Sequence, residues 1–356
     1  MNKFKIGKSS IGKDAKVYFI ADIAANHDGN LSRAKNLIRL CAKAGANAAK
    51  FQHFKAETIV SDSGFKNIGK ITHQAKWKKS VFEVYKDASI NPKWTKELAK
   101  ECKKNEIDFL TAPYDLEYVD EVNKFIPAYK IGSGDITWRD IIIKIAKKKK
   151  PVLLASGAST LQETIDATKL ILKYNKKLIL MQCNTNYTNS LKNFKYINLK
   201  ALLEFKDIFK DKIILGLSDH TPGHSSVLGA VTLGAKVIEK HFTDNNYRNG
   251  PDHAFSLNPK TWHAMVMASR QLELSLGNGK KKLEFNEKKS VIVQRRGVWI
   301  KKYLKKGEKL KKEHLKFLRP CPQKSISPFF IDKYLGKKAK INLKIDSLLT
   351  KKCLSL

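Results

Sequence analysis

The sequence contains no uninterrupted apolar run of the roughly 18–20 residues that a membrane-spanning helix needs. The segment 1–5 already carries two lysines, so the apolar region of a secretory signal peptide is also missing. The five cysteines are widely separated, odd in number and include no CxxC pair, which disfavours both a disulfide framework and a zinc cluster. We therefore expect a cytoplasmic protein that has no membrane span.

Acidic residues are scarce. The chain of 356 residues has 33 Asp and Glu against 69 Lys and Arg, which gives a formal net charge of +36. Such an excess raises the possibility of nucleic-acid binding. However, the lysines are spread over the whole chain, and no helix-turn-helix, zinc-finger or RNA-recognition pattern is present. We expect a solvated lysine surface and no specific nucleic-acid binding.

Short apolar segments alternate with amphipathic helical patterns along the first three quarters of the chain, which is typical of βα units in a parallel sheet. Helices are expected at 31–44, 137–148, 161–172, 225–234 and 259–276. Strands are expected at 17–23, 47–51, 107–111, 128–131, 151–155, 178–183, 213–217 and 236–240. Eight such units favour an α/β fold of the TIM (β/α)8 barrel type. An open doubly wound sheet stays possible, because periodicity does not count strands reliably.

Polar residues follow almost every predicted strand at its carboxyl end, where TIM barrels build their active sites. One group of polar residues after a strand is weak evidence for a site. Several such groups at the same position of successive βα units predict a convergent pocket. The residues that share this position are Asp22, Lys50, Gln52, Thr111, Lys130, Ser133, Asp135, Ser156, Thr185, Tyr187, Ser218, His220, Glu239 and His241.

Two histidines lie at the ends of neighbouring predicted strands. Because residues two apart on a strand share a face, Ser218 with His220 and Glu239 with His241 point to the same side. The two imidazoles could form half of a divalent-metal site that a carboxylate, substrate or water completes. The alternative is a pair of structural histidines bonded to backbone. Six further histidines have weaker or purely structural interpretations, and they are His27, His53, His73, His253, His263 and His314.

Two lysines and a glycine-flanked serine are suited to binding an anion. Lys50 and Lys130 stand near strand ends, and Ser133 lies between Gly132 and Gly134, where backbone amides can approach an oxygen closely. The alternatives are a tight turn for the glycines and surface positions for the lysines. Apolar neighbours on the same strands argue against surface lysines.

Taken together, these strings resemble the N-acetylneuraminate (sialic acid) synthase family, which includes legionaminic and pseudaminic acid synthases. The motifs that carry the resemblance run in order along the chain as Asn26-His27-Asp28-Gly29, Lys50-Phe51-Gln52, Tyr129-Lys130-Ile131-Gly132-Ser133-Gly134-Asp135, Gly216-Leu217-Ser218-Asp219-His220-Thr221, Glu239-Lys240-His241-Phe242-Thr243-Asp244 and Gly250-Pro251-Asp252-His253.

The end of the chain resembles the small antifreeze-like (SAF) domain of that family, a β-clip fold. Its motifs are Ser290-Val291, Leu304-Lys305-Lys306-Gly307, Leu318-Arg319-Pro320 and Leu335-Gly336-Lys337. We therefore expect a barrel domain at 1–280, a hydrophilic linker at 281–289 and an SAF domain at 290–356.

The resemblance implies an enzyme that condenses phosphoenolpyruvate with an N-acetylated amino sugar, either N-acetylmannosamine or a di-N-acetylated deoxyhexose, and releases phosphate by C–O cleavage. It implies a domain-swapped homodimer. It also implies that His220 and His241 bind a divalent cation, Mn²⁺ or Mg²⁺, and that this cation polarises the sugar aldehyde. Phosphoenolpyruvate would lie against Lys50, Lys130, Ser133 and Ser218. The sugar would lie against Gln52, Tyr187, Asp252, Asp135 and, from the partner subunit, Arg319.

Several positions depart from the family pattern. The family commonly has glutamate at Asp22 and Asp135, which are our candidates for the carboxylate that steadies a cationic centre or handles a proton. It often has hydroxyl residues at Ala112 and Ala155, and asparagine at Thr185. The neighbouring hydroxyls of Thr111 and Ser156 are candidates to replace the first two. These departures leave the acceptor sugar open.

Two other functions remain as alternatives at this stage. One is a Schiff-base aldolase with Lys50 or Lys130 as its nucleophile. The other is a non-catalytic carbohydrate- or nucleic-acid-binding barrel. The segment 57–91 is either a lid over the pocket or a pair of surface helices with a loop.

Overall fold

The computed structural model describes residues 3–69, 71, 74 and 77–355, so the predicted structural histidine His73 lies outside the described residues. The chain divides into two compact units, Met1–Gly277 and Asn278–Leu356. No helix in the described ranges combines the length and the apolar character needed to cross a membrane.

The first unit contains a closed barrel of eight parallel strands in the order β10-β3-β4-β5-β6-β7-β8-β9. The predicted TIM barrel is confirmed, and the ends of the predicted strands differ from the observed ones by two residues or fewer. The bounds are β3 (Tyr18–Asp22), β4 (Ala48–His53), β5 (Asp108–Pro113), β6 (Tyr129–Ile131), β7 (Val152–Ala155), β8 (Leu178–Cys183), β9 (Ile214–Asp219) and β10 (Val237–His241).

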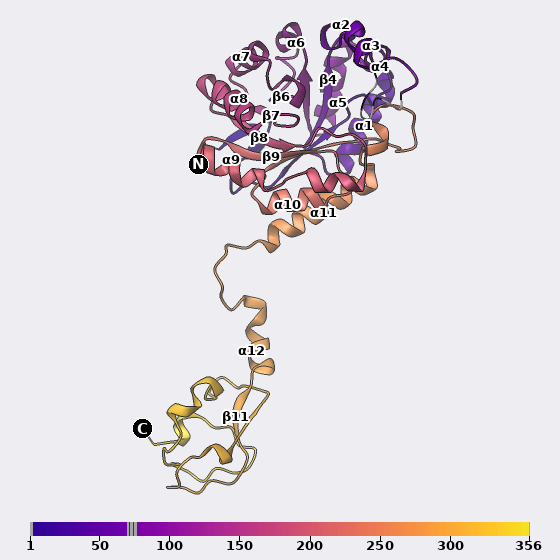
Figure 1. Cartoon of the computed structure of the whole chain (residues 1–356). Helices are drawn as coiled ribbons and strands as arrows, with labels where there is room; N and C mark the ends of the chain where they lie inside the picture. The colour runs from indigo at the N-terminus through magenta and orange to yellow at the C-terminus, as the bar shows by residue number, and fades with distance from the viewer. Residues whose placement is uncertain (1–2, 70, 72–73, 75–76, 356) are drawn as a thin grey trace. The chain divides into compact units, whose positions relative to one another are not determined.

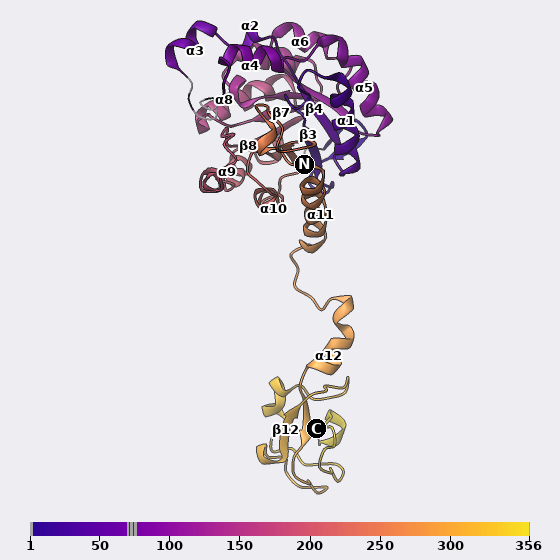
Figure 2. The ribbon, with the colours of Figure 1, turned by 90° about the vertical axis from the view of Figure 1, so that its right-hand side faces the viewer.

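Helices surround the strands on the outside of the barrel (Figures 1 and 2). Their amphipathic pattern explains this arrangement, because one face buries apolar residues such as Leu37 and Ile38 against the outward faces of the strands. A capping box of Thr160 and Glu163 begins one of these helices, α8 (Leu161–Tyr174). The helices are α1 (Leu31–Lys43), α5 (Thr95–Lys104), α6 (Leu116–Glu121), α7 (Arg139–Lys147), α8 (Leu161–Tyr174), α9 (Ala201–Phe209), α10 (Ser225–Thr232) and α11 (Pro259–Ser275).

An N-terminal hairpin that the sequence patterns did not predict closes one end of the barrel. Its strands are β1 (Phe4–Ile6) and β2 (Ser9–Ile11), paired antiparallel. Ile6 and Ile11 are 0% and 1% exposed, and they pack in one cluster with inward residues from the starts of the barrel strands, among them Tyr18. The hairpin thus seals the amino end and leaves the carboxyl end of the barrel for polar chemistry.

The segment predicted as a lid or helix pair contains three short helices, α2 (Ala56–Ile59), α3 (Asp62–Ile68) and α4 (Val81–Ala88). The ring of Tyr85 in α4 lies 5.5 Å from the ring of Phe54, which follows β4. This contact ties α4 to the carboxyl end of the barrel. Short 3-10 helices occur at η2 (Pro92–Trp94), η3 (Ser133–Asp135), η4 (Leu191–Tyr196), η5 (Lys210–Lys212) and η6 (His253–Phe255).

The second unit has a core of its own and a two-stranded antiparallel sheet, β11 (Gly297–Ile300) with β12 (Leu315–Leu318). The predicted linker 281–289 contains η7 (Phe285–Glu287) and the first residues of α12 (Lys288–Gln294). The remaining short helices are η8 (Lys312–His314), η9 (Pro328–Lys333) and η10 (Lys351–Cys353).

Candidate functional site

Four charged side chains are buried together at the carboxyl end of the barrel. Nζ of Lys50 lies 2.7 Å from Oδ2 of Asp22 and 3.5 Å from Oε1 of Glu239. The same Glu239 oxygen lies 3.5 Å from Nζ of Lys130 and accepts a hydrogen bond of 3.3 Å from Oγ of Ser218. All four charged residues are 4% exposed or less. Two cations balance two anions, which is how charges away from water are normally accommodated.

The charge state of Lys50 follows from these neighbours. Burial alone would lower the pKa of its amine, but Asp22 and Glu239 reverse this and raise the pKa above its ordinary value. Lys50 is therefore an ammonium at neutral pH, which favours anion binding over the nucleophilic amine of a Schiff-base aldolase. Oε2 of Glu239 is buried without a hydrogen-bond partner in the described chain.

The two predicted histidines face one another at the same end. His220 directly follows β9 and His241 ends β10, and their ring centroids are 5.4 Å apart. Nδ1 of His220 lies 2.9 Å from the carbonyl oxygen of Asn184, to which it donates. Nε2 of His241 lies 3.6 Å from Oδ2 of Asp22, and its Nδ1 lies 4.0 Å from Oδ2 of Asp252.

This pair fits part of a metal site. A metal-bound imidazole usually donates its second N–H to a carbonyl or carboxylate, as His220 does. Nδ1 of His241 is buried without a hydrogen-bond partner in the described chain, and burial, with help from His220 and Lys50, lowers its pKa well below the ordinary value. A neutral imidazole is the form that binds metal. No group of three or more His, Cys, Asp or Glu side chains among the described residues forms a complete site, so substrate or water would supply the rest.

Aromatic rings enclose the histidines. The ring of Tyr187, a predicted site residue, lies 4.3 Å from that of His220, and the ring of Phe255 lies 4.8 Å from that of His241. Phe255 lies in η6, after β10 and outside any strand periodicity, so no pattern in the sequence predicted it. Tyr187 and Phe255 also line a cavity of about 990 Å³, large enough for a substrate, together with Ala25, Trp77, Val84 and Gly250.

A second polar cluster surrounds Gly157, after β7. The amide of Gly157 donates to Oγ of Ser133 at 3.0 Å. A Cβ at Gly157 would lie 2.1 Å from Oγ1 of Thr185, 2.7 Å from Oγ of Ser133 and 3.1 Å from Sγ of Cys183, so only glycine fits there. Oγ1 of Thr185 is buried without a hydrogen-bond partner in the described chain. Ser133 and Thr185 were predicted as site residues, and Cys183 was not.

The structure does not bring Thr111 and Ser156 to the charged cluster. Thr111 follows the inward-facing Leu110, so its side chain faces the helices, where Oγ1 donates to the carbonyl of Phe51 at 3.0 Å. Oγ of Ser156 donates to the carbonyl of Met181 at 3.0 Å. Each stands one place from an inward residue, and the alternation of strand faces turns it outward.

The predicted carboxylates Asp135 and Asp252 border the same region. Burial raises the pKa of Asp135 to about 6, against the opposing effect of Lys130. Burial also raises the pKa of Asp252 to about 6. Nε2 of Gln52 lies 3.5 Å from Oδ2 of Asp22, at the limit of a hydrogen bond. Arg319 belongs to the second unit, where Nε donates to the carbonyl of Gln294 at 2.6 Å.

Comparisons with known proteins match both units. Residues 37–281 match the NeuB family, and residues 295–355 match the SAF domain. An N,N'-diacetyllegionaminic acid synthase of Campylobacter jejuni is 37% identical over 338 residues, which cover 94% of this chain and 99% of that protein. A pseudaminic acid synthase of the same species is 32% identical over 339 residues, covering 94% and 96%.

Solved structures give the same result. A crystal structure of an N-acetylneuraminic acid (sialic acid) synthetase from Leptospira borgpetersenii aligns with a TM-score of 0.70 at 26% identity, covering 82% of this chain and 95% of that chain. The resemblance seen in the motifs, and the expected barrel with a C-terminal SAF domain, are therefore confirmed.

Proposed function

Because the chain belongs to the NeuB family, we propose that it is a nonulosonate synthase that condenses phosphoenolpyruvate with an N-acetylated amino sugar and releases phosphate. The acceptor is N-acetylmannosamine or a di-N-acetylated deoxyhexose. The names of the similar relatives support this class of reaction. The observation that carries the proposal is the burial of two lysines beside two facing histidines at one end of the barrel.

The buried charged cluster around Lys50 and Lys130, called the lysine cluster below, would bind the anionic substrate. Lys50, Lys130, Ser133 and Ser218 supply donors from three strands and the turn after β6, and a charge-assisted hydrogen bond contributes about 1.5–3 kcal/mol. A phosphate or carboxylate would displace Glu239, at 3.5 Å from both ammonium groups, more readily than Asp22 at 2.7 Å. Thr111 and Ser156 are left out of this substrate site because their hydroxyls face elsewhere.

His220 and His241 would hold Mn²⁺ or Mg²⁺, which would supply Lewis-acid polarisation of the sugar aldehyde. The carbonyl of Asn184 keeps the ring of His220 in place through the 2.9 Å hydrogen bond. Gln52, Tyr187 and Asp252 stand around the pair and would orient the open-chain sugar, with Thr185 at the border with the phosphate.

The bond changes follow from this placement. The C2=C3 electron pair of phosphoenolpyruvate would form a bond from C3 to the aldehyde carbon, which leaves positive character at C2, and the aldehyde oxygen would take a proton to become a hydroxyl. Water would add at C2 and lose a proton, and the hemiketal phosphate would break its C2–O bond to give a ketone and phosphate. Asp22 is held by Lys50 and would steady the positive centre. Asp135, with a pKa of about 6, would accept or return a proton near neutral pH.

We also propose the assembly and location that the resemblance implies. The enzyme would be a domain-swapped homodimer in the cytoplasm, in which Arg319 of the SAF domain contacts the N-acetyl group of a sugar bound by the other subunit. Sedimentation of the purified full chain would give a dimer mass, and a monomer mass would contradict this part of the proposal.

The function is tested with purified protein, phosphoenolpyruvate and a panel of sialic, legionaminic and pseudaminic acid precursors. We expect phosphate release that requires both substrates and stops when EDTA removes the divalent cation. Mass spectrometry of the product then identifies the acceptor. No phosphate release with any precursor in the presence of Mn²⁺ or Mg²⁺ would contradict the proposal.

A further inference from the structure

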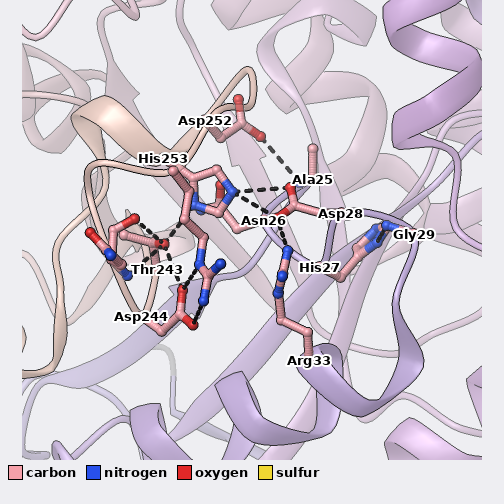
Figure 3. A network of polar contacts seen from close by, with 12 residues as sticks. Ala25, Asn26, His27, Asp28, Gly29, Arg33, Thr243, Asp244, Asp252 and His253 are labelled. Carbon is pink, nitrogen blue, oxygen red and sulfur yellow. Dashed lines mark hydrogen bonds and ion pairs between the residues drawn. The ribbon is translucent and has the colours of Figure 1, made fainter.

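A chain of polar contacts joins the loop after β3 to the loop after β10 at the edge of the barrel mouth (Figure 3). The two carboxylate oxygens of Asp28 lie 3.0 and 3.2 Å from Nε2 of His253. Nδ1 of His253 lies 2.7 Å from Oγ1 of Thr243. The His253 side chain is 0% exposed, and Arg33 forms an ion pair with Asp28 from outside. His253 therefore bridges two loops that are 225 residues apart in the sequence.

Both ring nitrogens of His253 are engaged, which fixes the orientation of the ring. The Asp28 carboxylate can only accept, so Nε2 carries a proton and donates to it. Oγ1 of Thr243 in turn accepts from the amide of Asn245 at 3.2 Å. The ring is therefore attached to the carboxylate of one loop and to the backbone of the other.

The loop after β3 has backbone angles that contacts with its surroundings must hold in place. Ala24 and Asp28 have φ of 44° and 46°, in the left-handed region that residues other than glycine rarely adopt. Such conformations persist only where surrounding contacts hold them. Nδ2 of Asn26 supplies two such contacts, with the carbonyl of Phe242 and with Oγ of Ser256, both at 2.9 Å.

Asp252 depends on both ends of the bridge. It immediately precedes His253, and its Oδ2 accepts a hydrogen bond of 3.1 Å from the amide of Ala25. The same oxygen lies 4.0 Å from the buried Nδ1 of His241, which has no hydrogen-bond partner among the described residues. A shift of either loop would therefore move the Asp252 carboxylate relative to the histidine pair.

We propose that Asp28 and His253 are positioning residues that hold Asp252 beside His241 and so orient the amino sugar. The inference rests on the proposed function, in which Asp252 faces the sugar. Neither residue belongs to the lysine cluster, so phosphoenolpyruvate binding does not depend on them. A merely structural histidine would change stability without distinguishing between the two substrates.

The kinetic test compares Asp28→Ala, His253→Ala and the double variant with wild type. Misplaced substrate groups reduce rates by about 10- to 100-fold, so we expect kcat/KM for the amino sugar to fall by that factor. KM for phosphoenolpyruvate should stay within about twofold of the wild-type value. The double variant should have a kcat/KM for the amino sugar no lower than that of the less active single variant, because each single substitution already breaks the same bridge. Asp28→Asn, which keeps an acceptor for Nε2, should restore most of the activity.

Glu273→Ala is the matched control. Glu273 pairs with Arg270 at 2.7 Å and accepts from the amide of Val17 at 2.7 Å, so it also joins distant segments, but at the amino end of the barrel. Its kcat/KM should stay within about twofold of wild type below its unfolding temperature. A rise in KM for phosphoenolpyruvate as large as the loss in kcat/KM for the amino sugar, or multiplicative losses in the double variant, would overturn the proposal. If Asp28→Ala does not fold, Asp28→Ser takes its place in the kinetic test, and the same changes in kcat/KM and KM are expected.

Hydrogen exchange separates this inference from the proposed function. The amide of Ala25 is held by Asp252, so Asp28→Ala and His253→Ala should each speed exchange in residues 24–29 by about tenfold or more, while Glu273→Ala should not. Unchanged exchange in both variants would overturn the bridge itself. If wild type is inactive with every acceptor, the proposed function fails, and the exchange result still decides whether the bridge holds Asp252.

Discussion

Nζ of Lys50 lies 2.7 Å from Oδ2 of Asp22, and both side chains are 2% exposed. Removing one partner of such a buried pair leaves an uncompensated charge and destabilises a protein by about 3–5 kcal/mol. We expect Lys50→Met to lower the free energy of unfolding by that amount, measured by urea denaturation, and to abolish turnover. Lys55→Met is the control, because Lys55 pairs with Glu117 on the surface and its loss should leave stability unchanged. A Lys50→Met protein as stable as wild type would contradict the assigned pair.

If His220 and His241 hold the divalent cation, substitution of either one should weaken metal binding. His220→Ala and His241→Ala should each weaken Mn²⁺ binding by more than about 100-fold, since loss of outer contacts alone costs 10–100-fold. Calorimetric titration of metal-free protein measures this without any substrate. His263→Ala, at an exposed position of α11, should bind Mn²⁺ as wild type does. Unchanged affinity in both site variants would refute the metal assignment.

Asp135 predicts a pH dependence of stability. Burial raises its pKa to about 6, whereas aspartates in an unfolded chain titrate near 3.9. The folded state therefore binds this proton more tightly, and the resulting stabilisation is present below about pH 4 and lost as the pH rises through about 6. Asp135→Asn should raise the melting temperature at about pH 7.5 and leave it nearly unchanged at about pH 4. Asp140→Asn, on the exposed start of α7, is the control, and an equal shift at both pH values would refute the raised pKa.

The N-terminal hairpin predicts an effect on stability without an effect on chemistry. Ile6 is 0% exposed and packs into the amino end of the barrel, so Ile6→Ala should lower the free energy of unfolding by about 2–5 kcal/mol. Activity per folded molecule should not change, because the site lies at the opposite end. Lys5→Ala on the same strand is exposed and should change neither. A loss of activity in fully folded Ile6→Ala would show that the hairpin contributes to the site.

Much of the site could be predicted from strand periodicity. Once Lys50, Ser218 and His220 are placed at strand ends, alternation puts them on one face, and neighbouring strands bring His220 to His241. The alternation of strand faces also places Glu239 inward, although the resemblance gave Glu239 no role. Since Leu110 points inward, the same alternation turns its neighbour Thr111 outward, which could have been predicted from the sequence.

The rest depends on contacts that leave no local pattern. The left-handed φ of Asp28 and its contact with His253 arise from two loops far apart in the chain, so no window of sequence contains both. Phe255 reaches His241 through such a loop, and the hairpin at Ile6 is too short for a periodic signal. Local propensity does not encode such long-range packing.

The central claim is that this barrel joins phosphoenolpyruvate to an amino sugar and breaks the C2–O bond. The most direct measurement uses phosphoenolpyruvate labelled with ¹⁸O at the bridging oxygen, with mass spectrometry of both products. We predict that the released phosphate carries the label and that the nonulosonate contains the carbons of both substrates. Label retained in the sugar product, or no joined product with any acceptor, would contradict the account.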